Sequence, residues 1–348
     1  MIKTEYYKDL TKLNTFGMKV KAHCFIEYDS VVDLVEIDFE ELGRPVLHIG
    51  GGSNLLFTDD FKGTVLHSKI NFIEPLEGEE GDESVCVSVG SGVKFDDFCA
   101  WAAENGLWGV ENLSHIPGEV GAAAIQNIGA YGVEVKDVIK MVGCYDTVDE
   151  EFVNIDVEDC EYGYRDSAFK DPEIKGRYIV THVVFELSKT PKPRLEYGNL
   201  AETVAKLSKG EPTLASIRKA VIQTRKEKLP EPSVMGSAGS FFKNPVVDQE
   251  EFQKIVSVAK AELGGDYEVP HYDLEDGKVK VPAAWMIEQC GFKGKRSGGA
   301  AVYDKQPLVI VNYTGEAYPE EILGMEKRIV SSVKSKFGIE LQPEVEHI

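Results

Sequence analysis

Two glycine-rich segments constrain this chain most, because each interrupts the regular pattern around it. The first, "IGGGSNLLF" at residues 49–57, places three consecutive glycines directly after an apolar run. The second, "IPGEVGAAAIQNIGAYG" at 116–132, spreads glycines among alanines and carries no charge after Glu119. Glycine costs backbone entropy, so such runs mark tight turns or places where backbone N–H groups approach another group closely. Each alone can be a turn, but together they indicate two loops that could hold a diphosphate and a ring system.

Other glycine motifs narrow the kind of ligand. Neither segment has the G-K-[ST] of a P-loop, which excludes that way of holding a nucleotide triphosphate and its magnesium. A third turn, "GSGVKF" at 90–95, supplies G-x-G after an apolar run but has Phe95 where a dinucleotide fingerprint needs its third glycine. A nicotinamide-binding Rossmann unit therefore stays a disfavoured alternative.

The spacing of apolar residues predicts two α/β units and a third, C-terminal one. Strand, helix and strand alternate up to about residue 72, and an acidic stretch at 74–84 predicts an exposed loop. After residue 230 the composition changes, which indicates a separate α+β unit over about 231–330. The predicted strands are 22–28, 45–57, 63–70, 85–92 and 339–348, and the predicted helices are 30–42, 94–106 (ending at Gly106) and 213–230 (stopped by Pro230).

Composition limits the partners. The chain has 348 residues, enough for two or three domains, and 59 acidic against 38 basic side chains give a net charge of -21, which argues against nucleic-acid binding. A phosphorylated small molecule could still enter a locally basic pocket. The start lacks a signal-peptide pattern and no apolar run approaches a membrane span, so we expect a cytoplasmic protein without a membrane partner.

Cysteine and histidine spacing bears on metals and redox state. The six cysteines form no C-x-x-C pair, which predicts reduced, mostly buried thiols. The seven histidines show no H-x-x-x-H spacing. We therefore expect no protein metal site.

A serine in "GSAGSFFKNP", residues 236–245, raises a question of role. Ser240 follows a glycine and precedes two phenylalanines, and most such serines close turns. The chain contains no G-x-S-x-G elbow of the kind that activates a nucleophilic serine. If Ser240 takes part in chemistry, its role must be a different one.

Eight motifs, in order and spacing over nearly the whole chain, resemble the UDP-N-acetylenolpyruvoylglucosamine reductase family. They are "NTFG" at 14, "GGGSNLLF" at 50, "IPGEVGAAAIQNIGAYG" at 116, "YGYRDSAFK" at 162, "GSAGSFFKNP" at 236, "WMIEQCGFKG" at 285, "GGAAV" at 298 and "LQPEVEHI" at 341. The resemblance implies a monomeric, NADPH-dependent flavoenzyme with non-covalent FAD that reduces an enolpyruvyl sugar nucleotide for peptidoglycan synthesis.

The implied fold is α+β: a two-part FAD-binding domain of the vanillyl-alcohol-oxidase type, followed by a C-terminal α+β substrate domain. We expect the first FAD subdomain over 1–72 and the second over 73–230 together with a C-terminal strand at 338–348. The substrate domain is expected over 231–337. Tyr197 in "LEYGNL" is similar to the tyrosine of a loop that covers the substrate, and this implies the loop-bearing subgroup.

The resemblance also implies the catalytic residues. Arg165 matches an arginine that binds the substrate carboxylate, and Ser240 matches the donor of a proton to an enolate carbon. Glu344 matches a second catalytic position, which acts with Arg165 on that carboxylate or through its protonation state. Without the family, a surface ion pair of Arg165 with Asp166 would be the favoured interpretation. A hydroxyl of high pKa suits a strongly basic carbon acceptor.

Binding residues follow from the same motifs. The implied FAD contacts are Gly50, Gly51, Gly52, Ser53, Asn54, Leu55, Ile116, Pro117, Gly118, Gly121, Ala122, Gln126 and Gly129, and the implied substrate contacts are Tyr131, Tyr197, Lys228, Asn244 and Gln289. One departure concerns Glu346, which stands where related sequences can carry an arginine. Arg225 or Lys243 could compensate for the reversed charge.

Two alternatives remain at this stage. One is a carbohydrate or alcohol oxidase on the same fold, which would use oxygen in place of NADPH. The other is a nucleotide-sugar binding protein without catalysis. NADPH consumption with and without the enolpyruvyl substrate distinguishes all three.

Overall fold

The computed structural model of the protein describes residues 1–80, 83–208 and 210–348. It divides into two compact units, which are described separately here. Unit 1 comprises Met1–Asp9, Lys21–Gly52 and Asp60–Lys226, and unit 2 comprises Leu10–Val20, Ser53–Asp59 and Glu227–Ile348. The second unit therefore takes two short segments from the N-terminal part of the chain.

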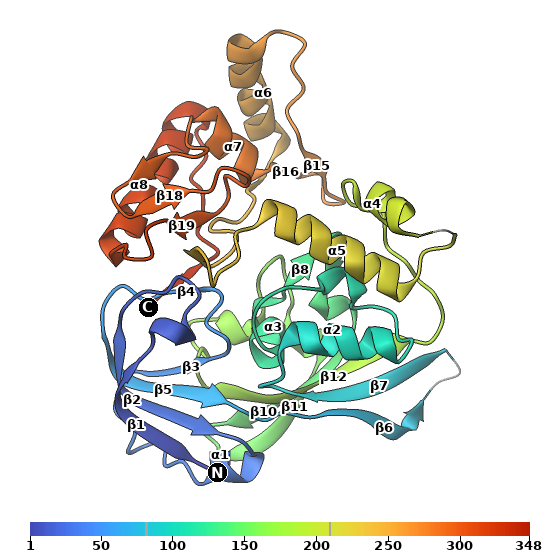
Figure 1. Ribbon diagram of the computed structural model, residues 1–348, viewed down its shortest axis with the longest axis vertical. Helices are drawn as coiled ribbons and strands as arrows, with labels where there is room; N and C mark the ends of the chain where they lie inside the picture. Colours follow the sequence, from blue (N-terminus) through green and yellow to red (C-terminus); the bar gives the residue numbers. More distant parts are fainter. Residues whose placement is uncertain (81–82, 209) are drawn as a thin grey trace. The chain divides into compact units, whose positions relative to one another are not determined.

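The first sheet of unit 1 contains the predicted β-α-β unit. Its strand order is β1-β2-β5-β3, formed by Lys3–Asp9, Lys21–Tyr28, Phe61–Ser68 and Val46–Ile49. β5 pairs in parallel with both β2 and β3, whereas β1 pairs antiparallel with β2 (Figure 1). Parallel pairing requires a crossover connection, and α1 lies within one such connection.

Helix α1 (Val31–Val35) is shorter than the helix predicted over 30–42. Ser30 caps it, since its hydroxyl accepts a hydrogen bond from the N–H of Asp33. Further along, the Asp38 carboxylate accepts hydrogen bonds from the N–H groups of Glu40 and Glu41. Such local side-chain bonds compete with helical ones, and the predicted helix was therefore too long.

The second sheet of unit 1 is antiparallel, in the order β11-β10-β12-β7-β6. Its strands are β6 (Ile73–Glu80), β7 (Ser84–Gly90), β10 (Ile139–Asp146), β11 (Glu151–Asp156) and β12 (Tyr178–Ser188). The loop predicted over 74–84 was wrong for most of its length, because β6 pairs with β7. Edge strands tolerate charged side chains, and β6 is such an edge. Residues 81 and 82 of that prediction lie outside the described residues.

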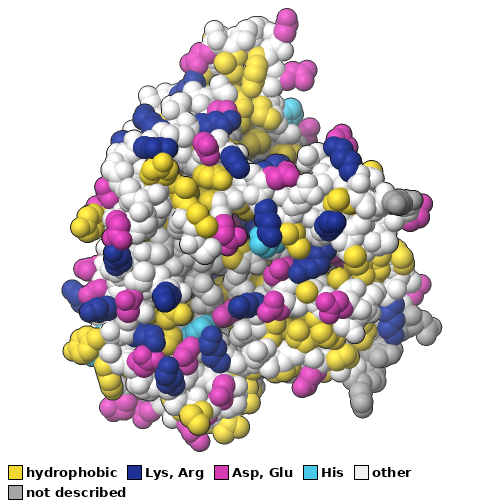
Figure 2. All heavy atoms as spheres, in the orientation of Figure 1, with side chains coloured by type: hydrophobic (Ala, Val, Ile, Leu, Met, Phe, Trp, Pro, Cys, Tyr) yellow, Lys and Arg dark blue, Asp and Glu magenta, His cyan; other side chains and the backbone are white. Residues whose placement is uncertain are grey.

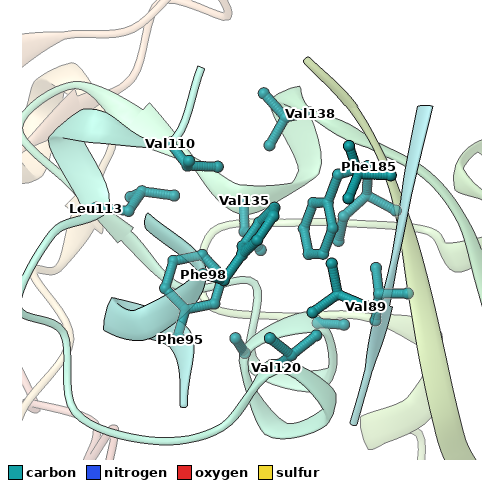
Figure 3. Close-up of a cluster of buried hydrophobic side chains, with 14 of the residues drawn as sticks. Val89, Phe95, Phe98, Val110, Leu113, Val120, Val135, Val138 and Phe185 are labelled. Carbon is teal, nitrogen blue, oxygen red and sulfur yellow. The ribbon is translucent and has the colours of Figure 1, made fainter. Parts of the chain in front are cut away.

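Two helices pack on the second sheet and build the main core of unit 1 (Figures 1 and 3). α2 (Phe95–Glu104) confirms the helix predicted over 94–106, and Gly106 follows it at φ +73°. α3 (Val120–Gln126) was not predicted. The rings of Phe98 and Phe185 lie 4.5 Å apart between centroids, both fully buried. A short hairpin of β8 (Gly129–Ala130) and β9 (Val133–Glu134) follows α3.

Two more helices lie at the C-terminal end of unit 1 in the sequence. α4 (Leu200–Leu207) and α5 (Leu214–Lys228) share a buried cluster with Trp108. The boundaries of α5 confirm the helix predicted over 213–230, which Pro230 stops. Its last residues, from Glu227, belong to unit 2.

Unit 2 has the α+β composition expected after residue 230. A four-stranded sheet has the order β13-β19-β18-β17, from Gly236–Ser237, Ile310–Asn312, Ala300–Val302 and Arg296–Ser297. A smaller sheet joins β14 (Val246–Val247), β16 (Val279–Lys280) and β15 (Tyr272–Asp273). The helices are α6 (Gln249–Leu263), α7 (Ala283–Gln289) and α8 (Pro319–Phe337), of which α8 contacts β18 and β19.

The C-terminal segment belongs to unit 2. β20 (Glu346–His347) pairs in parallel with β4 (Leu55–Leu56), so the strand predicted over 339–348 is much shorter than expected. Pro343 forms only an isolated bridge with Phe242, since proline lacks the N–H that a ladder needs. Residues 338–348 were expected with the second FAD subdomain, but the contacts group them with 227–337. The assignment of flavin and substrate domains stays a prediction.

The structure shows the distribution of surface charge, the burial of the cysteines and the character of the helices. On the face shown in Figure 2, basic and acidic side chains are interspersed. Five of the six cysteines are buried, Cys290 is half-buried, and all six are free thiols. Among the residues that the structure describes, none of the helices combines the length and apolar character needed to cross a membrane.

Candidate active site

The two glycine-rich segments meet in unit 1. A Cβ on Gly50 would lie 2.9 Å from the Cβ of Ala122, and one on Gly51 would lie 3.2 Å from the Cα of Gly118. Real Cβ atoms do not approach a neighbour this closely without displacing it, so any larger residue would push the segments apart. The structure therefore brings together the two segments that the sequence singled out.

Crowding explains further glycines of the second segment. A Cβ on Gly121 would lie 2.8 Å from the Cβ of Ser91, and one on Gly129 would lie 2.7 Å from Nη1 of Arg165. The sequence pattern predicted that these glycines approach a ligand, whereas the contacts show that close packing of the chain already requires them. Gly52 and Gly118 have φ of +62° and +119°, which favours glycine for a second reason.

The remaining predicted FAD residues of the first segment lie in unit 2. Nδ2 of Asn54 donates a hydrogen bond to the carbonyl of Glu344 at 3.1 Å, and the N–H of Glu346 donates to the carbonyl of Asn54 at 2.9 Å. Leu55 lies in β4. A segment predicted to bind the cofactor thus also holds the backbone of a predicted catalytic residue.

Ser240 and Glu344 lie on adjoining segments of unit 2. The N–H of Glu344 donates to the carbonyl of Phe241 at 2.8 Å, and the N–H of Lys243 donates to the carbonyl of Gln342 at 2.9 Å. Phe241 is fully buried and fixes this segment to the core. Ser240 itself is half-buried and follows Gly239, whose φ is +71°. The backbone bonds therefore place the residues next to the serine beside the glutamate.

Arg165 lies at a tight turn in unit 1. Gly163 and Asp166 exchange both backbone hydrogen bonds around it, and its φ is +56°. Its guanidinium donates to the carbonyls of Gly129 at 2.5 Å and Asn127 at 3.3 Å. Nη1 also lies 3.7 Å from a carboxylate oxygen of Glu134. The turn and these contacts hold the guanidinium against the second glycine-rich segment.

Several residues in or near the second glycine-rich segment have strained backbone angles. His115, Asn127, Tyr131 and Arg165 all have positive φ, between +47° and +61°. Non-glycine residues adopt such angles at a cost, and they persist where the surroundings impose them. Their concentration here supports a functional role for this part of unit 1.

Two buried asparagines were missed by sequence reasoning. Nδ2 of Asn127 donates to the carbonyl of Gly163 at 2.7 Å and so holds the turn that carries Arg165. Nδ2 of Asn112 donates to the carbonyls of Tyr131 at 2.9 Å and Arg194 at 2.8 Å. A lone asparagine in a run of small and apolar residues is the signal that could have found Asn127.

Lys170 also supports the site. Its ammonium donates to Oε1 of Gln126 and to the carbonyl of Arg165, both at 2.9 Å. The side chain of Gln126, a predicted FAD contact, is therefore linked through a lysine to the turn that carries Arg165.

The two tyrosines predicted to bind substrate lie together. The rings of Tyr131 and Tyr197 are 6.1 Å apart between centroids and nearly perpendicular, at 86°. Burial raises the pKa of Tyr131, while the nearby charge of Arg225 opposes that shift. Burial lowers the pKa of Arg225, whose Nε donates to the carbonyl of His115 at 3.1 Å. Unit 1 thus contains an aromatic pair beside a cation.

Three predicted substrate residues belong to unit 2. Lys228 is exposed at the last residue of α5. Oδ1 of Asn244 accepts a hydrogen bond from the N–H of Ala283 at 2.9 Å, at the start of α7. Gln289 ends that helix, and its carbonyl accepts from Lys336 at 2.8 Å. Six helical rises separate the two ends of α7 by about 9 Å.

Comparison with known proteins identifies the family. Residues 231–348 match the model of the C-terminal domain of UDP-N-acetylenolpyruvoylglucosamine reductase, and residues 27–156 match an FAD binding domain. The UDP-N-acetylenolpyruvoylglucosamine reductase of Bacteroides fragilis is 48% identical over 337 residues, covering 96% of this chain and 97% of the relative. The chain belongs to the UDP-N-acetylenolpyruvoylglucosamine reductase family.

Further relatives agree. The reductase of the same name from Porphyromonas gingivalis is 44% identical over 342 residues and covers 97% of each chain. The crystal structure of the Thermus caldophilus reductase aligns with a TM-score of 0.66 at 22% identity, covering 100% of this chain and 98% of that one, and so shows the shared fold. The predicted family, the FAD cofactor and the α+β fold with an FAD-binding domain before a C-terminal domain are confirmed.

The residues present fit an FAD group. The FAD-domain match spans both glycine-rich segments. Where these segments meet, they carry hydrogen atoms in place of side chains, and Gly52 and Gly118 adopt angles that allow consecutive N–H groups to turn toward an anion. The individual contact residues stay predictions.

Proposed function

We propose that this protein is an FAD-dependent oxidoreductase that converts UDP-N-acetylenolpyruvoylglucosamine to UDP-N-acetylmuramate with NADPH, in the synthesis of peptidoglycan precursors. The observation that carries the proposal is similarity over nearly the full length to relatives that bear this enzyme's name, with both domain models matched in order. We also propose that the enzyme works as a monomer in the cytoplasm.

We assign cofactor binding to the two glycine-rich segments. FAD, when bound, supplies hydride transfer between NADPH and the enolpyruvyl group. We propose that Gly50–Gly52 and the segment 116–129 contact it through their backbone, with Ser53, Asn54 and Leu55 continuing the first segment. The close contact between Gly51 and Gly118 supports this assignment, because it leaves only backbone at that point.

Arg165 is proposed to bind the substrate carboxylate. Hydride addition to the vinyl carbon leaves negative charge that spreads onto this carboxylate, and a guanidinium can donate two parallel hydrogen bonds to it. The contacts of Arg165 with two backbone carbonyls orient its side chain before substrate arrives. Such fixed donors stabilise developing charge without reorganising during the reaction.

Ser240 is proposed to donate the proton that completes the reduction. The acceptor is an enolate carbon, which is basic enough to take a proton from a hydroxyl. Glu344 is proposed to act beside Ser240. The hydrogen bond between Glu344 and Phe241, the residue after Ser240, supports the assignment of Ser240 and Glu344 to one site. Lys228, Asn244, Gln289, Tyr131 and Tyr197 are proposed to bind the sugar nucleotide.

Steady-state NADPH oxidation tests this function. We expect the rate to depend on UDP-N-acetylenolpyruvoylglucosamine and to be nearly absent with UDP-N-acetylglucosamine, which lacks the enolpyruvyl group. An oxidase would instead consume oxygen in the absence of NADPH when given its alcohol substrate. A binding protein would bind the sugar nucleotide without oxidising NADPH, and either result would overturn the proposal.

A further inference from the structure

A buried charged cluster in unit 1 has no role in the proposed reaction. His67, in β5, is 2% exposed, and its two ring nitrogens face two different carboxylates. Nδ1 lies 3.2 Å from Oε1 of Glu27, in β2, and Nε2 lies 3.1 Å and 3.2 Å from the two carboxylate oxygens of Glu119. Glu119 is itself buried, with 8% exposure. These three residues are called the Glu27–His67–Glu119 cluster below.

His67 bridges two carboxyl groups. One ring nitrogen lies within hydrogen-bonding distance of Glu27 and the other within hydrogen-bonding distance of Glu119. Lys69 faces the same cluster, with Nζ 3.8 Å from Oε1 of Glu27. The ring therefore connects β2 to the residue that precedes α3.

The neighbouring titratable groups stay neutral. The Tyr28 hydroxyl, in β2, and Nε2 of His48, in β3, are 2.7 Å apart. Burial, and after it the charge of His67, lowers the pKa of His48 to about 4. Burial also raises the pKa of Tyr28. Near neutral pH, His48 and Tyr28 are therefore uncharged.

One member of the cluster, Glu119, belongs to the second glycine-rich segment. Glu119 follows Gly118, which contacts Gly51, and a Cβ on Gly50 would lie 3.4 Å from Oε2 of Glu119. Glu119 is also the residue before α3, but its side chain makes no capping bond to that helix. Its carboxylate contacts His67 instead, so the second glycine-rich segment is fastened to the first sheet through this ring.

We propose that His67, which bridges Glu27 and Glu119, is a positioning residue that fixes the second glycine-rich segment against the first and thereby sets the affinity for FAD. The inference rests on the proposed FAD-dependent function. Loss of the ring would leave the buried carboxyl group of Glu119 without this partner, and an unsatisfied buried polar group is costly enough to shift the segment that carries it.

The test is FAD titration of protein freed of its flavin, followed by quenching of flavin fluorescence. We expect H67N and E119Q each to raise the Kd for FAD by about tenfold or more, the scale of one lost buried charged hydrogen bond. The double variant should lie closer to the parent than the sum of the two changes, because both substitutions remove the same contact between residues 67 and 119.

A matched control separates positioning from general loss of stability. D146N removes another largely buried carboxylate of unit 1. Asp146 is the last residue of β10 and pairs with Arg177. We expect D146N to lower the melting temperature without changing the Kd for FAD. Variants of the cluster should change the Kd even at temperatures where circular dichroism shows them folded.

If the parent binds FAD and its Kd is unchanged by both substitutions, the inference is overturned. A parent protein that binds no FAD would instead overturn the proposed function.

Discussion

At the scale of single residues, Ser240 is the position where a structural and a catalytic role differ most clearly. It is half-buried after a glycine with positive φ, as a turn residue would be. Its neighbour Phe241 is nevertheless hydrogen-bonded to Glu344. Position alone is compatible with both roles, so kinetics must distinguish them.

Replacement of Ser240 with alanine should slow substrate reduction by about a hundredfold or more, the contribution of a missing general acid. NADPH oxidation in a single turnover should stay nearly normal, because that half-reaction involves no enolate. Cysteine at the position should restore part of the rate. Stopped-flow absorbance separates the two half-reactions, and an unchanged second half-reaction in Ser240→Ala would reduce Ser240 to a turn residue.

Lys228→Ala tests the assignment of an exposed cation to the sugar nucleotide. We expect KM for the sugar nucleotide to rise about tenfold or more, with little effect on the NADPH half-reaction, since a substrate-binding contact is lost. The matched control is Lys226→Ala, another exposed lysine two residues earlier on α5. Equal effects of the two substitutions would indicate general charge rather than a specific contact.

At the scale of elements, periodic segments could be predicted and edge or local effects could not. α2 and α5 follow from apolar spacing and clear stop signals, Gly106 and Pro230. β6 was missed because its acidic sequence resembles a loop, and only its pairing with β7 makes it a strand. α1 is shorter than predicted because Asp38 binds nearby N–H groups.

The end of β10 provides a test of stability. Arg177 donates three hydrogen bonds to Asp146 at 2.6–2.9 Å, which, against the opposing effect of burial, lowers the pKa of Asp146. Asp146→Asn should therefore lower the free energy of unfolding by about 1–3 kcal/mol at neutral pH. The exposed neighbour Asp149, also paired with Arg177, is the control, and Asp149→Asn should change it by less than about 1 kcal/mol.

The sign of the pH effect follows from the direction of the shift. Because the pKa of Asp146 is lower in the folded than in the unfolded state, its contribution is present above the unfolded value of about 3.9 and is lost as the pH falls through the folded value. Urea unfolding of parent and Asp146→Asn should differ at pH 7 and converge below about pH 4. A difference that grew in acid would contradict this assignment.

At the scale of the whole molecule, the sequence predicted the family more completely than the site. Motifs in order over the chain predicted an FAD-dependent reductase, and the relatives confirm the family. The supporting contacts were beyond sequence reasoning, because they join distant residues. Asn54 and Glu344 are 290 positions apart, and His67 and Glu119 are 52 apart. The structure was needed to show that glycines predicted to contact a ligand are also required by close packing of the chain.

The central claim is that this chain passes hydride from NADPH to an enolpyruvyl sugar nucleotide through bound FAD. Anaerobic absorbance of the purified, FAD-loaded protein tests it most directly. We predict that NADPH bleaches the flavin band and that UDP-N-acetylenolpyruvoylglucosamine restores it, whereas UDP-N-acetylglucosamine does not. Protein that takes up no FAD, or a bleached band that the enolpyruvyl substrate fails to restore, would contradict the account.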